Sequence, residues 1–308
     1  MELKFDKITA KIAEKLTAYY CLRDNNTCDS VFIGEYLWKD YFEIRYAISE
    51  ETHALHYIMK ADGRIYAAVP YCAPENLAAA WEEIREYFHK NLGRKLAVYL
   101  ADETSLDLMN LSEEQYEITE LRDAEDYLYN AQALKTLSGK KLHKKKNHLN
   151  AFLKEQEGHY QYRSLCCSDA SEVWEFLKQW KVQKDEHYAG LPEEEKELDG
   201  EILGVHDVLT SCSLLDVRMA GIYIDGKLEA FTLGSYNERL CMAVIHIEKA
   251  NPQIRGLYQF INQQFLLHEY KDAVLVNRED DVGIEELRQA KMSYNPIGLA
   301  KKYRILER

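Results

Sequence analysis

The sequence predicts an α/β (α+β) protein of two domains, in which mixed, mostly antiparallel sheets are flanked by helices. Its 308 residues, 46% of them hydrophobic, are too many for one ordinary core. Two Asp-Gly pairs, Asp62-Gly63 and Asp225-Gly226, stand between β-forming runs and predict tight hairpins. Each half also carries a hairpin, a helix and a strand in that order, which permits a topological duplication. We expect domains at residues 1–130 and 131–308.

The first half is expected to begin with a helix and to continue with strands. Ile8, Ile12, Leu16 and Tyr19 recur at helical spacing over residues 6–20. Residues 29–71 are rich in β-formers with partial alternation and predict strands. An amphipathic helix over 74–91 and a strand over 95–100 complete this α/β unit.

The second half is expected to begin with helices and to change to antiparallel strands near residue 217. The helices are predicted at 131–158 (one helix or a pair), 170–186 and 193–212. Next come strands at 219–224, 227–235 and 239–249, a helix at 255–270, a strand at 273–277, a helix at 284–292 and a last strand at 300–306.

Amino-acid composition indicates which classes of partner are disfavoured and in which cellular compartment the protein is expected. Lys and Arg total 39 and Asp and Glu total 52, so the net charge of −13 disfavours nonspecific binding to nucleic acid or anionic lipid. No stretch approaches the ~20 apolar residues of a membrane span, and no apolar signal core opens the chain. The seven Cys include no Cys-x-x-Cys pair, so we expect free, buried thiols and a cytoplasmic protein.

The first candidate site is a strand-to-helix turn at Gln253-Ile254-Arg255-Gly256-Leu257-Tyr258. Pro252 ends the preceding strand, and an apolar helix follows the turn. Free N–H groups at a helix N-terminus, with Arg255 and a permissive Gly256, suit a pyrophosphate. An ordinary turn with a capping glycine explains the same pattern, and one Gly and one Arg do not decide between the two.

Two further candidates lie on the strands beside this turn. His246 and Glu248 are two residues apart and share a strand face, where a buried Glu suits a general base and His246 a proton relay. They are equally compatible with a solvent-facing edge strand. Asn277 and Arg278 stand at the carboxyl end of the 273–277 strand, where ligands gather in α/β folds. No ligand spacing singles out a metal site.

A basic run, GKKLHKKKNH at residues 139–148, contrasts with the acidic chain around it. On a helix, Lys141, Lys144, Lys145 and His148 share one face. Such dense like charge destabilises a helix and invites an anionic partner, either the phosphates of a donor or a tRNA acceptor end. A solvated basic surface is the alternative.

Three segments resemble the family named for the C-terminal domain of phosphatidylglycerol lysyltransferase. They are GKKLHKKKNHLNAF at 139–152, IEKANPQIRGLY at 247–258 and VNREDDVGIEELRQAKMSYNP at 276–296. The resemblance covers essentially the whole chain. It implies a tandem GNAT-like fold, shared with the peptidoglycan-bridge aminoacyltransferases, and acyl or aminoacyl transfer to an amine or hydroxyl. It implies acyl-CoA or aminoacyl-tRNA as donor.

The same resemblance suggests roles for individual residues. Glu248 matches the base on the strand before the donor loop, and Asn277 matches a donor-side Asn. Gln253 to Gly256 keep the donor-loop pattern, whereas Tyr258 replaces a small residue. The usual acid Tyr has no counterpart at its place, so Tyr294 or Tyr258 is taken as its substitute.

Together these features lead to an acyl- or aminoacyltransferase as the main hypothesis. A small-molecule or peptide amine would be the acceptor, with Glu248 as base and Lys141, Lys144 and Lys145 near the donor. A tRNA at the basic helix is a candidate partner. The alternative is a non-catalytic ligand- or RNA-binding protein that retains the fold, supported by Tyr258 and the missing acid Tyr.

Overall fold

The computed structural model describes residues 3–187 and 192–308. It divides into two compact units. The first contains the chain up to Asp126, together with Asp280–Gly283 and Ala300–Arg308, and the second contains Tyr127–Glu279 and Ile284–Leu299. Each unit is built on one seven-stranded sheet.

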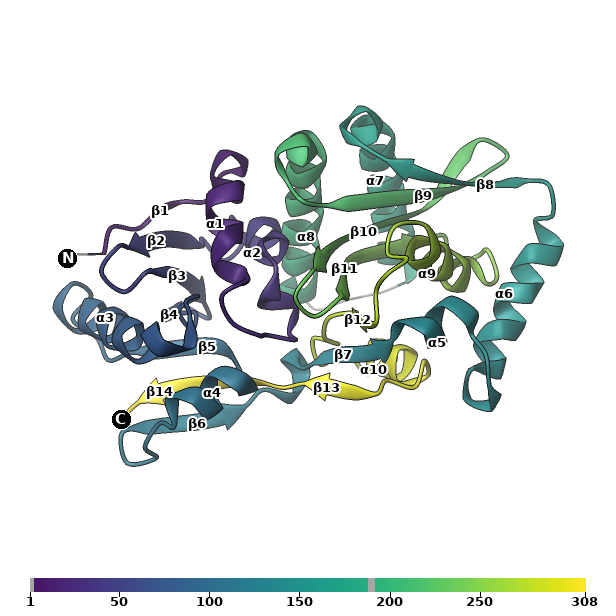
Figure 1. Ribbon diagram of the computed structural model, residues 1–308. Helices are drawn as coiled ribbons and strands as arrows, with labels where there is room; N and C mark the ends of the chain where they lie inside the picture. The colour runs from purple at the N-terminus through teal and green to yellow at the C-terminus, as the bar shows by residue number, and fades with distance from the viewer. Residues whose placement is uncertain (1–2, 188–191) are drawn as a thin grey trace. The chain divides into compact units, whose positions relative to one another are not determined.

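The sheet of the first unit has the order β1-β2-β3-β4-β5-β14-β6 (Figure 1). Every neighbouring pair is antiparallel except β4 and β5. The strands are β1 (Asp6–Lys7), β2 (Arg45–Ser49), β3 (Ala54–Ala61), β4 (Arg64–Ala67), β5 (Ala97–Asp102), β6 (Tyr116–Glu120) and β14 (Lys302–Glu307), and the α-helices are α1 (Ala13–Tyr20), α2 (Phe32–Trp38), α3 (Leu77–Lys90) and α4 (Glu103–Met109).

The sheet of the second unit has the order β13-β7-β12-β11-β10-β9-β8, with a parallel pair at β11 and β12. Its strands are β7 (Asp126–Asn130), β8 (Tyr160–Leu165), β9 (Arg218–Ile224), β10 (Lys227–Asn237), β11 (Met242–Ala250), β12 (Leu275–Asn277) and β13 (Gly298–Ala300). Its α-helices are α5 (Ala131–Thr136), α6 (His143–Glu155), α7 (Ala170–His187), α8 (Pro192–Ser211), α9 (Leu257–His268) and α10 (Glu285–Met292).

The two sheets repeat one topology, with one strand of each exchanged. Read from β1 and from β8, the orders match strand for strand, and equivalent helices connect equivalent strands. At the sixth position, the first sheet holds β14 from the end of the chain, and the second holds β7 from before its own first strand. The duplication that the sequence permitted is therefore present, and the tandem arrangement of mixed sheets is confirmed.

Local sequence explains most elements, although Asp6–Lys7, expected at the start of a helix, forms the short strand β1. Both Asp-Gly pairs form the expected hairpin turns, with positive φ at both turn residues. The strands expected from residue 29 are wrong over Phe32–Trp38, which forms α2. Phe32, Ile33, Tyr36 and Leu37 are its buried apolar residues, at helical spacing, so packing overrides their β propensity.

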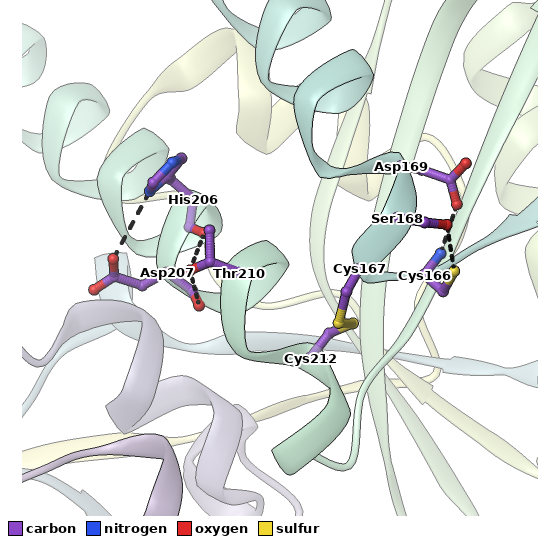
Figure 2. Close-up of a disulfide and its surroundings, with 8 residues drawn as sticks. All are labelled: Cys166, Cys167, Ser168, Asp169, His206, Asp207, Thr210 and Cys212. Atoms are coloured by element: carbon purple, nitrogen blue, oxygen red, sulfur yellow. Dashed lines mark hydrogen bonds and ion pairs between the residues drawn. A yellow bond between two sulfur atoms is a disulfide. The ribbon is translucent and has the colours of Figure 1, made fainter.

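The cysteines also differ from expectation. Cys167 and Cys212 form a disulfide that joins the start of α7 to the end of α8, with Cα atoms 5.7 Å apart (Figure 2). Cys21, Cys166 and Cys241 are exposed thiols rather than buried ones. The sequence gives no sign of this pairing, because the bridge spans 45 residues and depends on how α7 and α8 lie side by side.

In the described part of the chain, no helix has the length and apolar character that crossing a membrane requires.

Candidate functional site

The central feature of the second unit is the place where its parallel strand pair ends. Pairing between β11 and β12 stops at Val244 opposite Asn277, whereas β11 continues to Ala250. On its other edge, β11 carries a β-bulge at His246, because Ile245 and Ile247 pair with consecutive residues of β10. Bulges re-aim side chains and are common beside active sites. Beyond the bulge, residues 247–250 of β11 pair with β10 and extend past the end of the pairing with β12.

Glu248 lies just beyond this point and is held by two partners. Its side chain is 8% exposed, and Oε1 accepts a hydrogen bond from Arg278 Nη2 at 2.8 Å. Oε2 accepts one from Asn262 Nδ2, also at 2.8 Å. Asn262 belongs to α9 and is 2% exposed. Glu248 is thus a buried carboxylate, as a base at this position requires, but it is part of an ion pair rather than a lone acid.

Arg278 connects this carboxylate to two tyrosines. Its guanidinium carbon lies 4.8 Å from the centre of the Tyr294 ring and 5.9 Å from that of Tyr129. Burial by itself lowers the pKa of Arg278, but the Glu248 carboxylate, Tyr294 and Tyr129 together outweigh it and the pKa lies above its usual range. Burial also raises the pKa of Tyr294. The guanidinium is therefore permanently charged, and Tyr294 keeps its hydroxyl proton.

Lys145 approaches the same tyrosine from helix α6. Its Nζ lies 4.2 Å from the centre of the Tyr294 ring. Burial, with the positive charge of Arg278, lowers the pKa of Lys145 to about 8. A minor fraction of this amine is neutral near physiological pH, more than for an ordinary lysine, and such an amine suits proton transfer.

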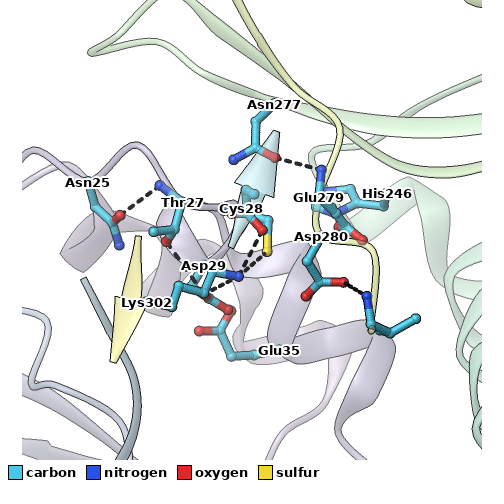
Figure 3. Close-up of polar contacts among 12 residues, drawn as sticks. Asn25, Thr27, Cys28, Asp29, Glu35, His246, Asn277, Glu279, Asp280 and Lys302 are labelled. Carbon is cyan, nitrogen blue, oxygen red and sulfur yellow. Dashed lines mark hydrogen bonds and ion pairs between the residues drawn. The ribbon is translucent and has the colours of Figure 1, made fainter. Parts of the chain in front are cut away.

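His246 and Asn277 form a neighbouring polar group through Glu279 (Figure 3). His246 Nδ1 lies 2.7 Å from Glu279 Oε1, and its Nε2 lies 2.7 Å from Ser235 Oγ. The Asn277 side-chain oxygen accepts a hydrogen bond from the Glu279 N–H at 2.7 Å. Both ring nitrogens of His246 therefore have partners, and Asn277 shapes the turn after β12.

The turn predicted to bind donor phosphates is packed more closely than its sequence indicates. Gly256 has φ +82°, and a Cβ there would lie 2.1 Å from the backbone oxygen of His148 in α6. The glycine is required by this helix contact as well as by its φ. The Gln253 N–H donates to the Asn251 side chain, and Arg255 is largely exposed. Leu257 is buried in the core at the start of α9, with Tyr258 partly buried against it.

The residues of the basic run differ in their surroundings. Lys141 lies in a 3-10 turn at 140–142, just before α6, and is exposed. Lys144, Lys146 and His148 on the helix are exposed too, while Lys145 turns inward to Tyr294. An exposed basic surface therefore exists on α6, and Lys145 is separate from it.

The structure thus brings together Glu248, Tyr294 and Lys145, through Arg278, and separately joins His246 to Asn277. Three residues of these groups, Asn262, Tyr129 and Glu279, were not predicted from the sequence. Asn262 carries a signal that was available, because an amide on the apolar face of α9 needs a buried partner. Among the described residues, no group of three or more His, Cys, Asp or Glu side chains is placed to hold a metal ion.

Comparison with known proteins shows the family and the fold. The family model of the phosphatidylglycerol lysyltransferase C-terminal domain matches residues 24–306. An uncharacterised protein of Mycoplasmoides gallisepticum is 26% identical over 211 residues, which cover 68% of this chain and 65% of that relative.

Two solved structures cover nearly the whole chain. A conserved protein of unknown function from Bacteroides thetaiotaomicron has a TM-score of 0.87 and 26% identity, over 99% of this chain and 100% of its own. The structure of L-PGS from Bacillus licheniformis has a TM-score of 0.67 at 16% identity, over 95% and 91%, and shows the same fold. The chain belongs to the family of the phosphatidylglycerol lysyltransferase C-terminal domain.

Proposed function

We propose that this protein transfers an aminoacyl group from aminoacyl-tRNA to a small-molecule or peptide amine, using the second unit. The observation that carries the proposal is the buried cluster of Glu248, Arg278, Tyr294 and Lys145 where β11 and β12 separate. Family membership supports aminoacyl transfer as the class of reaction. The exposed lysines of α6 supply positive charge beside this cluster.

The donor is argued from the two faces of α6. Its exposed residues Lys144, Lys146 and His148 offer positive charge to an RNA backbone. Its backbone at His148 lies directly against Gly256, so the helix occupies the side of this glycine on which a Cβ would stand. These features favour a tRNA held by its backbone over a CoA held in the turn.

In the proposed reaction, the acceptor amine attacks the ester carbonyl of the donor. A C–N bond forms, the bond to the ribose oxygen breaks, and the amine proton passes to Glu248 and finally to the leaving ribose oxygen. Arg278 offers a fixed positive charge to the oxyanion, and the protonated Tyr294 offers a hydroxyl. Lys145, partly neutral, is a second group able to accept the proton. His246 and Asn277 position the turn that carries Arg278.

The test is a transfer assay with bulk tRNA charged with labelled amino acids and a panel of amino acids and short peptides as acceptors. We expect labelled amide products, detected by mass spectrometry, and a fall of about 100-fold or more for Glu248→Gln. Glu238→Gln, at an exposed loop position, is the matched control. Full turnover in Glu248→Gln would remove Glu248 from the chemistry. Absence of any product with all charged tRNAs would favour the non-catalytic alternative.

Binding of tRNA is tested separately. Lys144→Ala with Lys146→Ala should weaken binding and flatten its dependence on salt, by about 0.7–0.9 in slope for each lost phosphate contact. Lys178→Ala with Lys227→Ala, at two exposed lysines elsewhere, is the control. An equal salt slope in both pairs would contradict the role of α6.

An acyl-CoA donor is the second candidate, and one observation favours it. Arg255 is exposed at the N-terminus of α9, where free N–H groups suit a phosphate. Saturating CoA would then raise the melting temperature, since a ligand at 100 times its dissociation constant stabilises by about 2.7 kcal/mol. A shift with CoA that Arg255→Ala removes, without a response to tRNA, would replace the first proposal.

A further inference from the structure

A surface pocket of about 260 Å³ lies in the second unit, and Tyr129 and Tyr294, whose rings lie near Arg278, are among its lining residues. Its floor includes the buried side chains Tyr129, Leu134, Leu142 and Tyr294. Lys140 and Lys141 line its exposed side. The volume is below the ~300–1,000 Å³ of pockets for drug-sized ligands, so the occupant is a small molecule or the end of a larger one.

The charge of the pocket is positive. Two lysines line it, and none of its lining residues in the described chain is Asp or Glu. The amine of Lys145 lies 4.2 Å from the centre of the ring of Tyr294, a lining residue, and adds to the positive potential when protonated. A cationic ligand would therefore meet like charge with no counter-ion, whereas an anion would meet two flexible ammonium groups.

The apolar floor of the pocket indicates which kind of ligand body fits there. Leu134 and Leu142, with the tyrosine rings, present an apolar surface that a fully hydrated anion does not use. An apolar body covering this floor removes it from water, at about 25 cal/mol for each Å² buried. Lysine heads at the rim and an apolar floor together fit a molecule with an anionic end and a compact hydrocarbon part.

We propose that this pocket binds a small carboxylate with an apolar side chain, of the amino-acid or peptide C-terminus type, and excludes a cationic one. The carboxylate lies at Lys140 and Lys141, and the side chain covers Leu134 and Leu142. The identification of this ligand as the acyl acceptor rests on the proposed function. The selection of ligands by charge is independent of that function. Tyr294 belongs both to the pocket and to the Glu248 cluster, so a ligand in the pocket would lie against a residue of that cluster.

The test uses four probes: N-acetyl-leucine, its uncharged amide, the cation leucinamide and, as a phosphate ester of similar size, hexyl phosphate. Binding to the full chain is measured by ligand-observed NMR with no donor present. We expect N-acetyl-leucine to bind at least tenfold more tightly than the amide, with no binding of leucinamide. Equal binding of leucinamide overturns the inference, and tighter binding of hexyl phosphate overturns the assignment of the anion as a carboxylate.

Two variants locate the binding. Lys140→Ser with Lys141→Ser should weaken N-acetyl-leucine binding at least tenfold, while Lys144→Ser with Lys146→Ser, on the neighbouring exposed face, should not. Ile297→Trp, at a pocket residue that is 63% exposed, fills the pocket without disturbing the core and should abolish binding. Unchanged binding in Ile297→Trp would place the ligand elsewhere. Confirmed binding without transfer in any assay would refute the proposed function and leave this inference standing.

Discussion

Replacing Lys145 by Met should make the second unit more stable near neutral pH. The pKa of Lys145 is about 8 in the folded protein, against an ordinary value of 10.5. That difference corresponds to about 3.4 kcal/mol at 1.36 kcal/mol per pH unit. Because the amine is only partly buried, solvent screening reduces this to roughly 1–2 kcal/mol, and loss of the contact with Tyr294 offsets about 0.5–1 kcal/mol of it.

The effect has a defined dependence on pH. The amine of Lys145 binds its proton more tightly in the unfolded chain than in the folded one. Below pH 8 the amine is protonated in both states, so the folded state carries the full cost of burying the charge. The penalty is lifted as pH rises from 8 towards 10.5, and wild-type stability rises accordingly. Lys145→Met lacks this dependence. The free energy of unfolding of the variant should therefore exceed that of the wild type by the largest amount at pH 7, and this difference should be smaller at pH 9.5.

Urea unfolding at pH 7.0, 8.2 and 9.5, followed by circular dichroism, measures the gap directly. Lys144→Met is the matched control, since Lys144 is exposed on the same helix and its replacement should change stability by less than about 0.5 kcal/mol. A gap that does not change with pH, or a variant less stable than the wild type at pH 7, would refute the reasoning. In the transfer assay, the stabilised Lys145→Met should be slower than the wild type.

Three further results are expected. Burial raises the pKa of Glu35 to about 8, so the first unit should lose stability as pH rises from about 4.5 to 8, and Glu35→Gln, compared in the same urea titrations, should abolish that loss. Gly256→Ala should destabilise the second unit by several kcal/mol in thermal melts, because its Cβ would meet the His148 carbonyl and its φ is positive. A fragment of residues 131–308 should be insoluble because it lacks β7, whereas 127–299 should fold, and size-exclusion chromatography with circular dichroism distinguishes the two.

Short-range signals in the sequence were enough to predict most of the fold. Asp62-Gly63 and Asp225-Gly226 define their hairpins by turn chemistry alone, and α3 and α9 follow from helical periodicity. The strand exchange is invisible at this level. β7 and β14 resemble any other short strand, and only pairing over long sequence separation decides which sheet receives each of them. The same limit applies to the bond between Cys167 and Cys212.

For the candidate site, single residues could be predicted from the sequence, but the contacts between them could not. Glu248 and Arg278 were both noted, 30 residues apart, but nothing in their spacing predicts that they form one ion pair. Lys145 looked like one of several surface lysines, and its inward turn depends on the position of Tyr294. Gly256 was interpreted as a glycine that lets a phosphate approach the backbone, and nothing in the sequence predicts that the backbone of α6 packs against it.

The composition of this cluster is itself an argument for function. Burying an ion pair such as Glu248 and Arg278 is often no better for stability than apolar residues of the same volume. Placing Lys145 beside it adds a further cost, visible in its lowered pKa. These groups stand where β11 extends past its pairing with β12. A buried region selected only for stability would not gather two cations, a carboxylate and two tyrosines, and this cost supports the proposal that the cluster acts on a bound substrate.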